Sequence, residues 1–334
     1  MPLLVSPRPR PRPMPAVSAP RSVRVSLTDR CDLACVYCRP HKQDGYLEKT
    51  LDSRAWRALL EGLALAGVRR VRITGGEPLL YPAVVEAVAL ACELGFEDIA
   101  LTTNATRLAR LAEPLRRAGL MRVNVSLDTL DPERFARMTR GGKLGPVLEG
   151  IEAARQVGFA ELKLNVVVLR SENDEELPGL VHYAWERGIV PRMLEVMAIG
   201  EGARIQDRVV PYSEMRERLA PLLEDEPPRR DEDRGPARYV HARHDPRLRV
   251  GFITGTTDTY CKGCDRLRVA ADGMLRPCLA TNDGVEAEAE ARSGDAEAVR
   301  DLTLLAWTKK PDGDTFKGCT EESASHVSIR KIGG

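Results

Sequence analysis

SVRVSLTDRCDLACVYC, residues 22–38, joins a short apolar strand to three closely spaced cysteines. The segment 22–27 is rich in Val and Leu and has the length of a buried strand. Five later segments share this character: 70–74, 97–102, 121–127, 161–169 and 191–197. The stretches between them are amphipathic and predict helices: 53–66, 82–95, 107–118, 144–157 and 174–187. Strands that alternate with helices indicate an α/β protein with a parallel sheet.

The ends of these helices carry their own signals. Asp52 and Ser53 are suitable caps for the helix at 53–66. Four glycines stand where a helix end needs a left-handed residue: Gly95, Gly119, Gly158 and Gly188.

Six consecutive β-α units predict an open or incomplete (β/α) barrel. A complete eightfold barrel needs two more units, and none is evident after Met197. A doubly wound open sheet is the alternative. Both architectures bind ligands at the carboxyl ends of the strands.

The chain divides into three expected regions. Residues 1–21 alternate Pro with Arg and predict an extended, mobile arm. Residues 22–200 hold the β-α units, and residues 201–334 form a C-terminal region. That last region contains a charged loop at 224–236, a β-rich segment at 237–253, and helices near 285–292 and 296–307.

Composition excludes several classes of protein. Lys and Arg total 50 and Asp and Glu total 49 among 334 residues, a net charge of +1. This balance argues against a protein that coats nucleic acid or an anionic membrane. The sequence lacks both the roughly 18–20 apolar residues of a membrane span and the apolar core of a signal peptide. We therefore expect a cytoplasmic protein without a nucleic-acid or membrane partner.

The eight cysteines are unusual for such a chain and favour metal or redox chemistry over disulfides. Cys31, Cys35 and Cys38 follow the first strand with the spacing C-x3-C-x2-C. Three thiolates on one loop can hold three corners of a [4Fe–4S] cluster and leave the fourth iron open. A zinc site that includes His41 is the alternative.

A second group comprises Cys261, Cys264 and Cys278, again without an obvious fourth ligand. It predicts a structural zinc site or a second cluster. Arg266 and Arg268 follow at a spacing that places both on one side of an extended segment, where they could bind phosphate or remain solvated.

The isolated Cys92 predicts a buried core thiol. Cys319 is expected to be an ordinary surface or core cysteine, with a fourth-ligand role as the alternative.

The first motif, with Tyr37 before its last cysteine, resembles the signature of the radical S-adenosylmethionine (SAM) superfamily. Gly75-Gly76-Glu77-Pro78 after the second strand resembles the glycine-rich SAM-contacting turn of these proteins. Both cysteine groups, the Arg pair and the terminal Gly333-Gly334 together resemble the GTP 3′,8-cyclase family, which acts in molybdenum cofactor (molybdopterin) biosynthesis. One departure is Ala105 after the stretch ALTTN, where that family usually has glycine.

The resemblance implies a fold, cofactors and a reaction. The fold would be an incomplete (β/α) barrel of the radical SAM type with a C-terminal extension that carries a second Fe–S site. The cofactors would be two [4Fe–4S] clusters and SAM. Reductive cleavage of SAM would yield a 5′-deoxyadenosyl radical that takes hydrogen from C3′ of GTP, and the carbon radical would attack C8 of guanine to give 3′,8-cyclo-7,8-dihydro-GTP.

The resemblance also implies residue roles. Cys31, Cys35 and Cys38 would hold the SAM cluster, and Cys261, Cys264 and Cys278 the second cluster. Residues contacting SAM would be Tyr37, Gly76, Ser126, Arg192 and Met197. Residues around GTP would be Arg24, Arg72, Thr102, Lys163, Arg266 and Arg268. Catalytic roles would fall to Arg266, Arg268, Gly333 and Gly334. Five of these residues are expected at the carboxyl ends of five strands: Arg72, Thr102, Ser126, Lys163 and Met197.

Expected partners, besides GTP, are a reductant protein such as flavodoxin or ferredoxin, the downstream cyclic pyranopterin monophosphate synthase, and a second copy of the chain. The alternation of apolar and polar residues at 327–332 predicts a strand-like tail before Gly333. Two other functions remain open from the residues alone: a two-cluster radical SAM enzyme that modifies a peptide, and a non-catalytic binding module supported by a metal.

Overall fold

The computed structural model describes residues 19–39, 45–48, 50–230, 235–311 and 329–332. Six strands occupy the predicted segments and pair in parallel, in chain order, within one sheet. They are β1 (Ser22–Ser26), β2 (Arg70–Thr74), β3 (Asp98–Thr103), β4 (Arg122–Ser126), β5 (Glu161–Val167) and β6 (Val190–Leu194).

Two further parallel strands come from the C-terminal region. Strand β9 (Arg249–Ile253) pairs with β6, and β10 (Arg266–Val269) pairs with β1. Strand β9 falls in the predicted β-rich segment 237–253, but its parallel pairing and the whole of β10 were not predicted. The chain reaches β9 through a hairpin and β10 through a cysteine turn, without the repeating β-α pattern.

Short antiparallel strands extend both ends of the sheet. Strands β11 (Met274–Arg276) and β12 (Val285–Glu286) follow β10, while β8 (Arg238–His241) and β7 (Arg229–Arg230) follow β9. Within the described residues the two outermost strands, β12 and β7, are not paired with each other. The sheet curves without closing, so the predicted incomplete barrel is confirmed.

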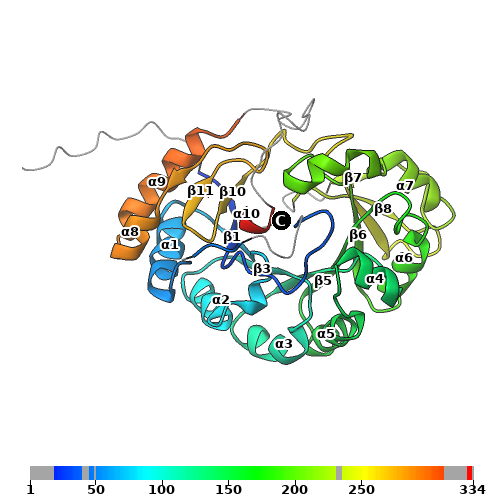
Figure 1. Cartoon of the computed structure of the whole chain (residues 1–334), viewed down its shortest axis with the longest axis horizontal. Helices are drawn as coiled ribbons and strands as arrows, with labels where there is room; N and C mark the ends of the chain where they lie inside the picture. Colours follow the sequence, from blue (N-terminus) through cyan, green and yellow to red (C-terminus); the bar gives the residue numbers. More distant parts are fainter. Residues whose placement is uncertain (1–18, 40–44, 49, 231–234, 312–328, 333–334) are drawn as a thin grey trace, which may run out of the picture.

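Helices cover the outer side of this curved sheet (Figure 1). The predicted helices are present as α1 (Ser53–Leu65), α2 (Val84–Glu93), α3 (Leu108–Arg117), α5 (Leu144–Val157) and α6 (Leu177–Trp185). The helices predicted near 285–292 and 296–307 are present as α8 (Glu288–Ser293) and α9 (Ala296–Thr308). The remaining helical segments are η1 (Pro78–Leu80), α4 (Pro132–Met138), η2 (Gly200–Arg208), α7 (Tyr212–Arg218) and α10 (Ile329–Ile332).

Local chemistry sets the helix ends as predicted. The Asp52 side chain accepts a hydrogen bond of 2.9 Å from the backbone N–H of Ala55 and so caps α1. The four glycines expected at helix ends all have positive φ: Gly95, Gly119, Gly158 and Gly188.

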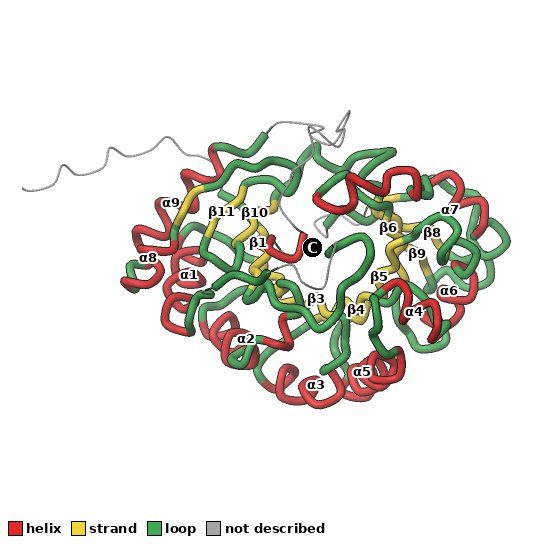
Figure 2. Tube along the Cα trace, in the orientation of Figure 1, coloured by secondary structure: helices red, strands yellow, loops and turns green. Residues whose placement is uncertain are grey.

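Successive side chains along each strand point to opposite faces of the sheet, so one face is apolar and the other is polar. Val23, Val25 and Leu101 belong to one continuous core with residues of α1, α2, α3 and α5. The alternate positions Arg24, Arg72 and Arg192 line the interior of the open barrel. Figure 2 shows loops gathered over this interior at the carboxyl ends of the strands.

The described part of the tail corrects one expectation. Residues Ile329–Ile332 form a helical turn, α10, and not a strand. Ile329 and Ile332 are three positions apart, so one helical turn directs both into an apolar cluster that includes Ile199 and Leu279. Residues 1–18 of the predicted arm, Cys319 and the Gly333-Gly334 pair lie outside the described residues.

Cys92 and Pro20 also differ from expectation. The Cys92 side chain is exposed on α2 and not buried. Its sulfur lies against Gly119, where a Cβ would collide with it. Pro20 is buried, and the backbone carbonyl of Arg21 accepts hydrogen bonds from Arg69 and Arg70 at the start of β2. Residues 19–21 are thus in contact with the sheet.

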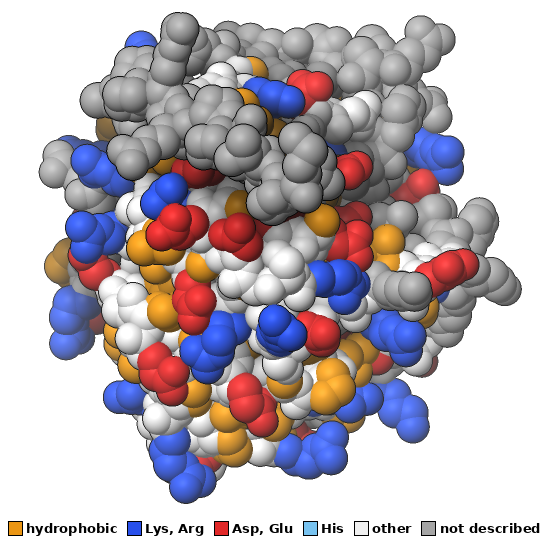
Figure 3. Space-filling view, turned by 90° about the vertical axis from the view of Figure 1, so that its left-hand side faces the viewer, with side chains coloured by type: hydrophobic (Ala, Val, Ile, Leu, Met, Phe, Trp, Pro, Cys, Tyr) orange, Lys and Arg blue, Asp and Glu red, His pale blue; other side chains and the backbone are white. Residues whose placement is uncertain are grey.

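The surface bears mixed charge. Acidic and basic side chains are interspersed over the side of the molecule that carries α8 and α9 (Figure 3). Among the described residues, each helix is too short or too polar to cross a membrane.

Ala105 has a left-handed backbone, with a φ of 63°, although it carries a side chain and is fully buried. This conformation costs a non-glycine residue about 1–2 kcal/mol. Gly150 of α5 makes room for it, since a Cβ at Gly150 would overlap the carbonyl oxygen of Ala105.

We expect Gly150→Ala to lower the free energy of unfolding by about 1–3 kcal/mol through this overlap. The matched control is Gly145→Ala in the same helix, where an added Cβ has no atom within 4 Å; it should gain roughly 0.5–1 kcal/mol. Anaerobic urea unfolding followed by circular dichroism measures both. Equal stabilisation of the two variants would show that α5 does not depend on this close contact.

Candidate functional site

One large cavity occupies the interior at the carboxyl ends of the strands. About 1420 Å³ of its space is not filled by protein atoms, and part of that space is open to solvent. Twelve of the predicted site residues line it: Arg24, Cys31, Cys35, Tyr37, Cys38, Arg72, Gly76, Thr102, Ser126, Arg192, Met197 and Arg268.

The first cysteine loop is held in place by backbone hydrogen bonds. The N–H groups of Ala34 and Val36 donate to the carbonyls of Thr139 and Met138 at the end of α4, over 3.2 and 2.9 Å. The Cys38 N–H donates to the Cys35 carbonyl over 2.9 Å, which closes a turn. The loop therefore presents its three thiols to the cavity from a fixed backbone.

Tyr37 anchors the same loop to the sheet. Its hydroxyl donates to Asp128 Oδ2 over 2.7 Å, and Asp128 Oδ1 accepts from the backbone N–H of Val167 over 2.8 Å. Asp128 thus connects the cysteine loop to the ends of β4 and β5. Burial raises the pKa of Asp128 to about 6, although these hydrogen bonds oppose the shift.

The Gly75-Gly76 turn packs directly against the residues that precede Cys31. Gly76 N–H donates to the Thr28 carbonyl over 2.7 Å, and Glu77 N–H donates to the Arg30 carbonyl over 2.8 Å. A Cβ at Gly76 would overlap the Arg30 carbonyl. These glycines are therefore needed for backbone packing in the chain itself, as well as for any approach to a ligand.

The thiols of this loop do not ionise readily by themselves. Burial raises the pKa of Cys35 and of Cys31, and the nearby Glu77 carboxylate adds to the shift at Cys31. A positively charged metal group would reverse this effect, because metal binding displaces thiol protons. Three partly buried thiols around one cavity therefore fit an iron–sulfur cluster.

Polar groups on the other walls also fit a bound ligand. Asn165 Oδ1 is buried in the cavity wall without a hydrogen-bond partner among the described residues. Arg192 donates from Nη2 to Asn124 Oδ1 over 2.6 Å, which fixes the direction of its guanidinium. Met197 is held by the Tyr260 hydroxyl, which lies 3.1 Å from its sulfur.

Arginines give the cavity a positive charge. Burial and repulsion from Arg192 lower the pKa of Arg72 to about 9, and burial and repulsion from Arg266 lower the pKa of Arg268 to about 10. Burial also lowers the pKa of Arg24, with Arg268 and Arg72 as further causes. A polyanion in this cavity would relieve the repulsion.

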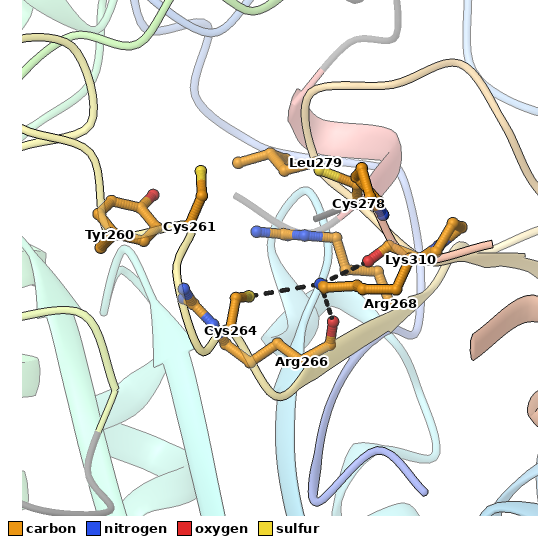
Figure 4. A pocket seen from close by; sticks show the side chains of 10 residues that line it. Tyr260, Cys261, Cys264, Arg266, Arg268, Cys278, Leu279 and Lys310 are labelled. Carbon is orange, nitrogen blue, oxygen red and sulfur yellow. Dashed lines mark hydrogen bonds between the residues drawn. The ribbon is translucent and has the colours of Figure 1, made fainter. Parts of the chain in front are cut away.

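The second cysteine group surrounds an adjoining cavity of about 470 Å³ (Figure 4). Cys261, Cys264 and Cys278 line it, together with Arg266 and Arg268 of β10. Cys264 N–H donates to the Cys261 carbonyl over 3.0 Å. Burial opposes ionisation of Cys264, but the charges of Arg266 and Lys310 outweigh it and lower its pKa to about 7. This donor set also fits an iron–sulfur cluster.

Among the residues that the structure describes, three His, Cys, Asp or Glu side chains nowhere converge tightly enough to hold a single metal ion. The thiols are instead spread around cavities. A four-iron cluster requires such spacing, because each thiolate binds a different iron.

Lys163 differs from the other predicted residues. It lies in the first half of β5 and does not line the cavity. Arg72 is the middle residue of β2, so neither is at the carboxyl end of its strand as expected. The Lys163 side chain is 4% exposed, and Nζ forms an ion pair with Glu161 over 2.7 Å. Burial lowers its pKa to about 8.

Four residues of the site were not singled out from the sequence. Asn104 Nδ2 donates to Asp32 Oδ1 over 2.8 Å and lies 3.9 Å from Cys31 Sγ. Asp128, Tyr260 and Lys310 contact Tyr37, Met197 and Cys264 respectively. Asn104 and Asp128 stand in polar stretches at strand ends, a position that could have marked them as site residues. The sequence around Lys310 has no comparable feature.

Two protein families match the chain, one over its N-terminal part and one over its C-terminal part. The Radical SAM superfamily matches residues 25–184, and Molybdenum Cofactor Synthesis C matches residues 189–316. The GTP 3′,8-cyclase of Pelotomaculum thermopropionicum is 38% identical over 299 residues, which cover 87% of this chain and 91% of that protein. That of Heliobacterium modesticaldum is 41% identical over 81% of this chain and 84% of that protein.

This chain belongs to the GTP 3′,8-cyclase family of radical SAM enzymes. Solved structures agree on the fold. Streptococcus suis SuiB matches 88% of this chain and 67% of its own with a TM-score of 0.63 at 17% identity. SuiB bound to S-adenosylmethionine matches with a TM-score of 0.58, covering 88% of this chain and 65% of its own at 17% identity.

We expect Gly76→Ala to disturb the first cysteine loop alone, because the new methyl group would push the Arg30 carbonyl away. After anaerobic reconstitution the variant should hold about four irons where the parent chain holds about eight. Iron counting measures the loss, and Gly145→Ala is the control. Full iron content in Gly76→Ala would show that the loop tolerates movement of this turn.

Proposed function

We propose that this chain is a GTP 3′,8-cyclase that uses SAM and two [4Fe–4S] clusters to form 3′,8-cyclo-7,8-dihydro-GTP for molybdenum cofactor biosynthesis. The observation that carries this proposal is a pair of adjoining cavities, each lined by one cysteine triad and both lined by Arg268. Family membership over most of the chain supports the same reaction.

In this proposal Cys31, Cys35 and Cys38 hold the first cluster, which leaves one iron for SAM. The bound cluster and SAM supply the one-electron cleavage that starts hydrogen abstraction from the substrate. Asp128 keeps Tyr37 against the sheet, so the cysteine loop stays in register with the ends of β4 and β5. Tyr37, Gly76, Ser126, Arg192 and Met197 are the proposed SAM contacts, and all of them line the cavity.

The cationic wall would bind the triphosphate. Arg24 and Arg72 lie on β1 and β2, while Arg266 and Arg268 lie on β10, the other neighbour of β1. Guanidinium groups pair with phosphate oxygens in two-point contacts. Thr102 is a proposed GTP contact on β3, and Lys163 would add charge deeper in the barrel. Cys261, Cys264 and Cys278 would hold the second cluster, which would supply an open iron as a binding site for the substrate.

Gly333 and Gly334 complete the proposed site. The backbone before them is directed to the cavity, because Arg268 Nη1 donates to the Ile332 carbonyl over 3.0 Å and Ile329 lines the wall. Glycines at the next two positions would have the small size needed beside two bound ligands.

The proposed setting is the cytoplasm, with flavodoxin or ferredoxin as electron donor, cyclic pyranopterin monophosphate synthase as the next enzyme, and a homodimer as the assembly. All seven cysteines in the described residues are free, which suits a reducing compartment.

Anaerobic incubation with SAM, dithionite and GTP tests the reaction, with products identified by mass spectrometry. The expected products are 5′-deoxyadenosine and a cyclised nucleotide of the same mass as GTP. SAM cleavage without a change in GTP would contradict the assigned substrate. A preparation that binds zinc and no iron would identify a binding module instead.

The double variant Arg266→Ala/Arg268→Ala should bind GTP roughly ten- to a hundred-fold more weakly, since a lost charged hydrogen bond costs about 1.5–3 kcal/mol. SAM cleavage without GTP should persist. Calorimetry measures GTP binding, and the control is Arg69→Ala, an exposed residue that pairs with Glu97 and lines neither cavity. Unchanged GTP affinity in the double variant would remove β10 from the substrate site.

A further inference from the structure

Lys310 lies inside the ligand set of the second cysteine group, although it comes from a distant part of the chain. It follows α9, and its Nζ donates to Cys264 Sγ over 3.3 Å, to the Arg266 carbonyl over 2.7 Å and to the Pro277 carbonyl over 2.6 Å (Figure 4). An ammonium group has three hydrogens, so these acceptors use its full donor capacity.

The acceptors lie on two separate segments. Cys264 and Arg266 belong to the turn that enters β10, whereas Pro277 directly precedes Cys278, just beyond β11. Strands β10 and β11 are antiparallel neighbours. Lys310 therefore joins the two segments that carry the cysteines, and it does so from a third element.

A residue of α9 also holds the Lys310 ammonium group in place. Nζ lies 5.4 Å from the centre of the Trp307 ring, within reach of a cation–π contact. Trp307 in turn packs against the main core. The lysine side chain is thus held between α9 and the cysteine segments.

A positive charge at this place also has an electrostatic consequence. Three thiolates and a [4Fe–4S] core carry a net negative charge that increases on reduction. A hydrogen bond from an ammonium group to a ligand sulfur stabilises the reduced state more than the oxidised one, and such bonds tune cluster potentials.

We propose that Lys310 is a positioning residue of the second cluster: it fixes the spacing between the Cys264 and Cys278 segments and raises the reduction potential of the cluster through its N–H···S bond. This inference rests on the proposed assignment of a cluster to Cys261, Cys264 and Cys278.

The test uses the full chain with Cys31, Cys35 and Cys38 replaced by Ala, so that only the second site binds iron. Lys310→Met removes the charge while keeping an unbranched side chain of similar length. Lys309→Met is the matched control, because the neighbouring Lys309 is exposed. Iron content and a potentiometric titration followed by electron paramagnetic resonance, both without SAM and GTP, are measured after anaerobic reconstitution.

The parent and Lys309→Met should hold about four irons and share one potential. Lys310→Met should lose iron or titrate at a more negative potential. Lys310→Arg keeps the charge but not the compact three-point contact, so its reduction potential should be nearer the parent value. Circular dichroism checks that each variant folds, and Lys310→Arg replaces Lys310→Met as the test variant if the latter does not fold.

Two results would overturn the role of Lys310. One is an iron content and potential in Lys310→Met equal to those of Lys309→Met. The other is an equal shift in both variants, which would indicate overall charge and not this hydrogen bond. A parent chain without iron would instead contradict the cluster assignment itself, so the two failures are distinguishable.

Discussion

Parallel pairing of β10 with β1 is the constraint on which both cysteine sites depend. Arg24 lies opposite Arg268 in this pairing, and the first cysteine loop follows β1 while the second triad flanks β10. Hydrogen bonding between these strands therefore brings the N-terminal and C-terminal cysteine segments to two adjoining cavities. Without it, the C-terminal cysteines would have no fixed relation to the first loop. The extended sheet also explains why the barrel remains open, since β11 and β12 continue it outward.

The same pairing concentrates positive charge. Arg24, Arg72 and Arg268 come from three adjacent strands and share a buried interior. Burial lowers the pKa of all three, and repulsion from Arg268 and Arg72 adds to the shift at Arg24. Other basic residues of the sheet are neutralised within the chain itself, as in the contacts of Arg122 with Asp98 and of Lys163 with Glu161. The arginine-rich wall of the cavity carries positive charge that a triphosphate can balance.

Local patterns predicted most of the fold and most of the candidate site. Strand and helix positions followed from periodicity, and cysteine spacing located both triads, because these signals lie within a few residues of one another. Long-range contacts were not predictable in this way. The β9 and β10 pairings, the exposure of Cys92 over Gly119 and the helical turn at Ile329–Ile332 all depend on residues distant in sequence.

Sequence alone determined which chemical groups are available: two groups of three thiols, a paired arginine motif, glycines before a tight turn, and strands whose ends meet at one edge. Tertiary structure alone decided how they meet. It brought three pairs of side chains into hydrogen-bonding contact: Lys310 with Cys264, Tyr260 with Met197, and Tyr37 with Asp128. It also paired Lys163 with Glu161, away from the cavity wall. The physical reason is that spacing along a chain specifies local backbone conformation, whereas a hydrogen bond between distant side chains exists only after the sheet has brought their strands together.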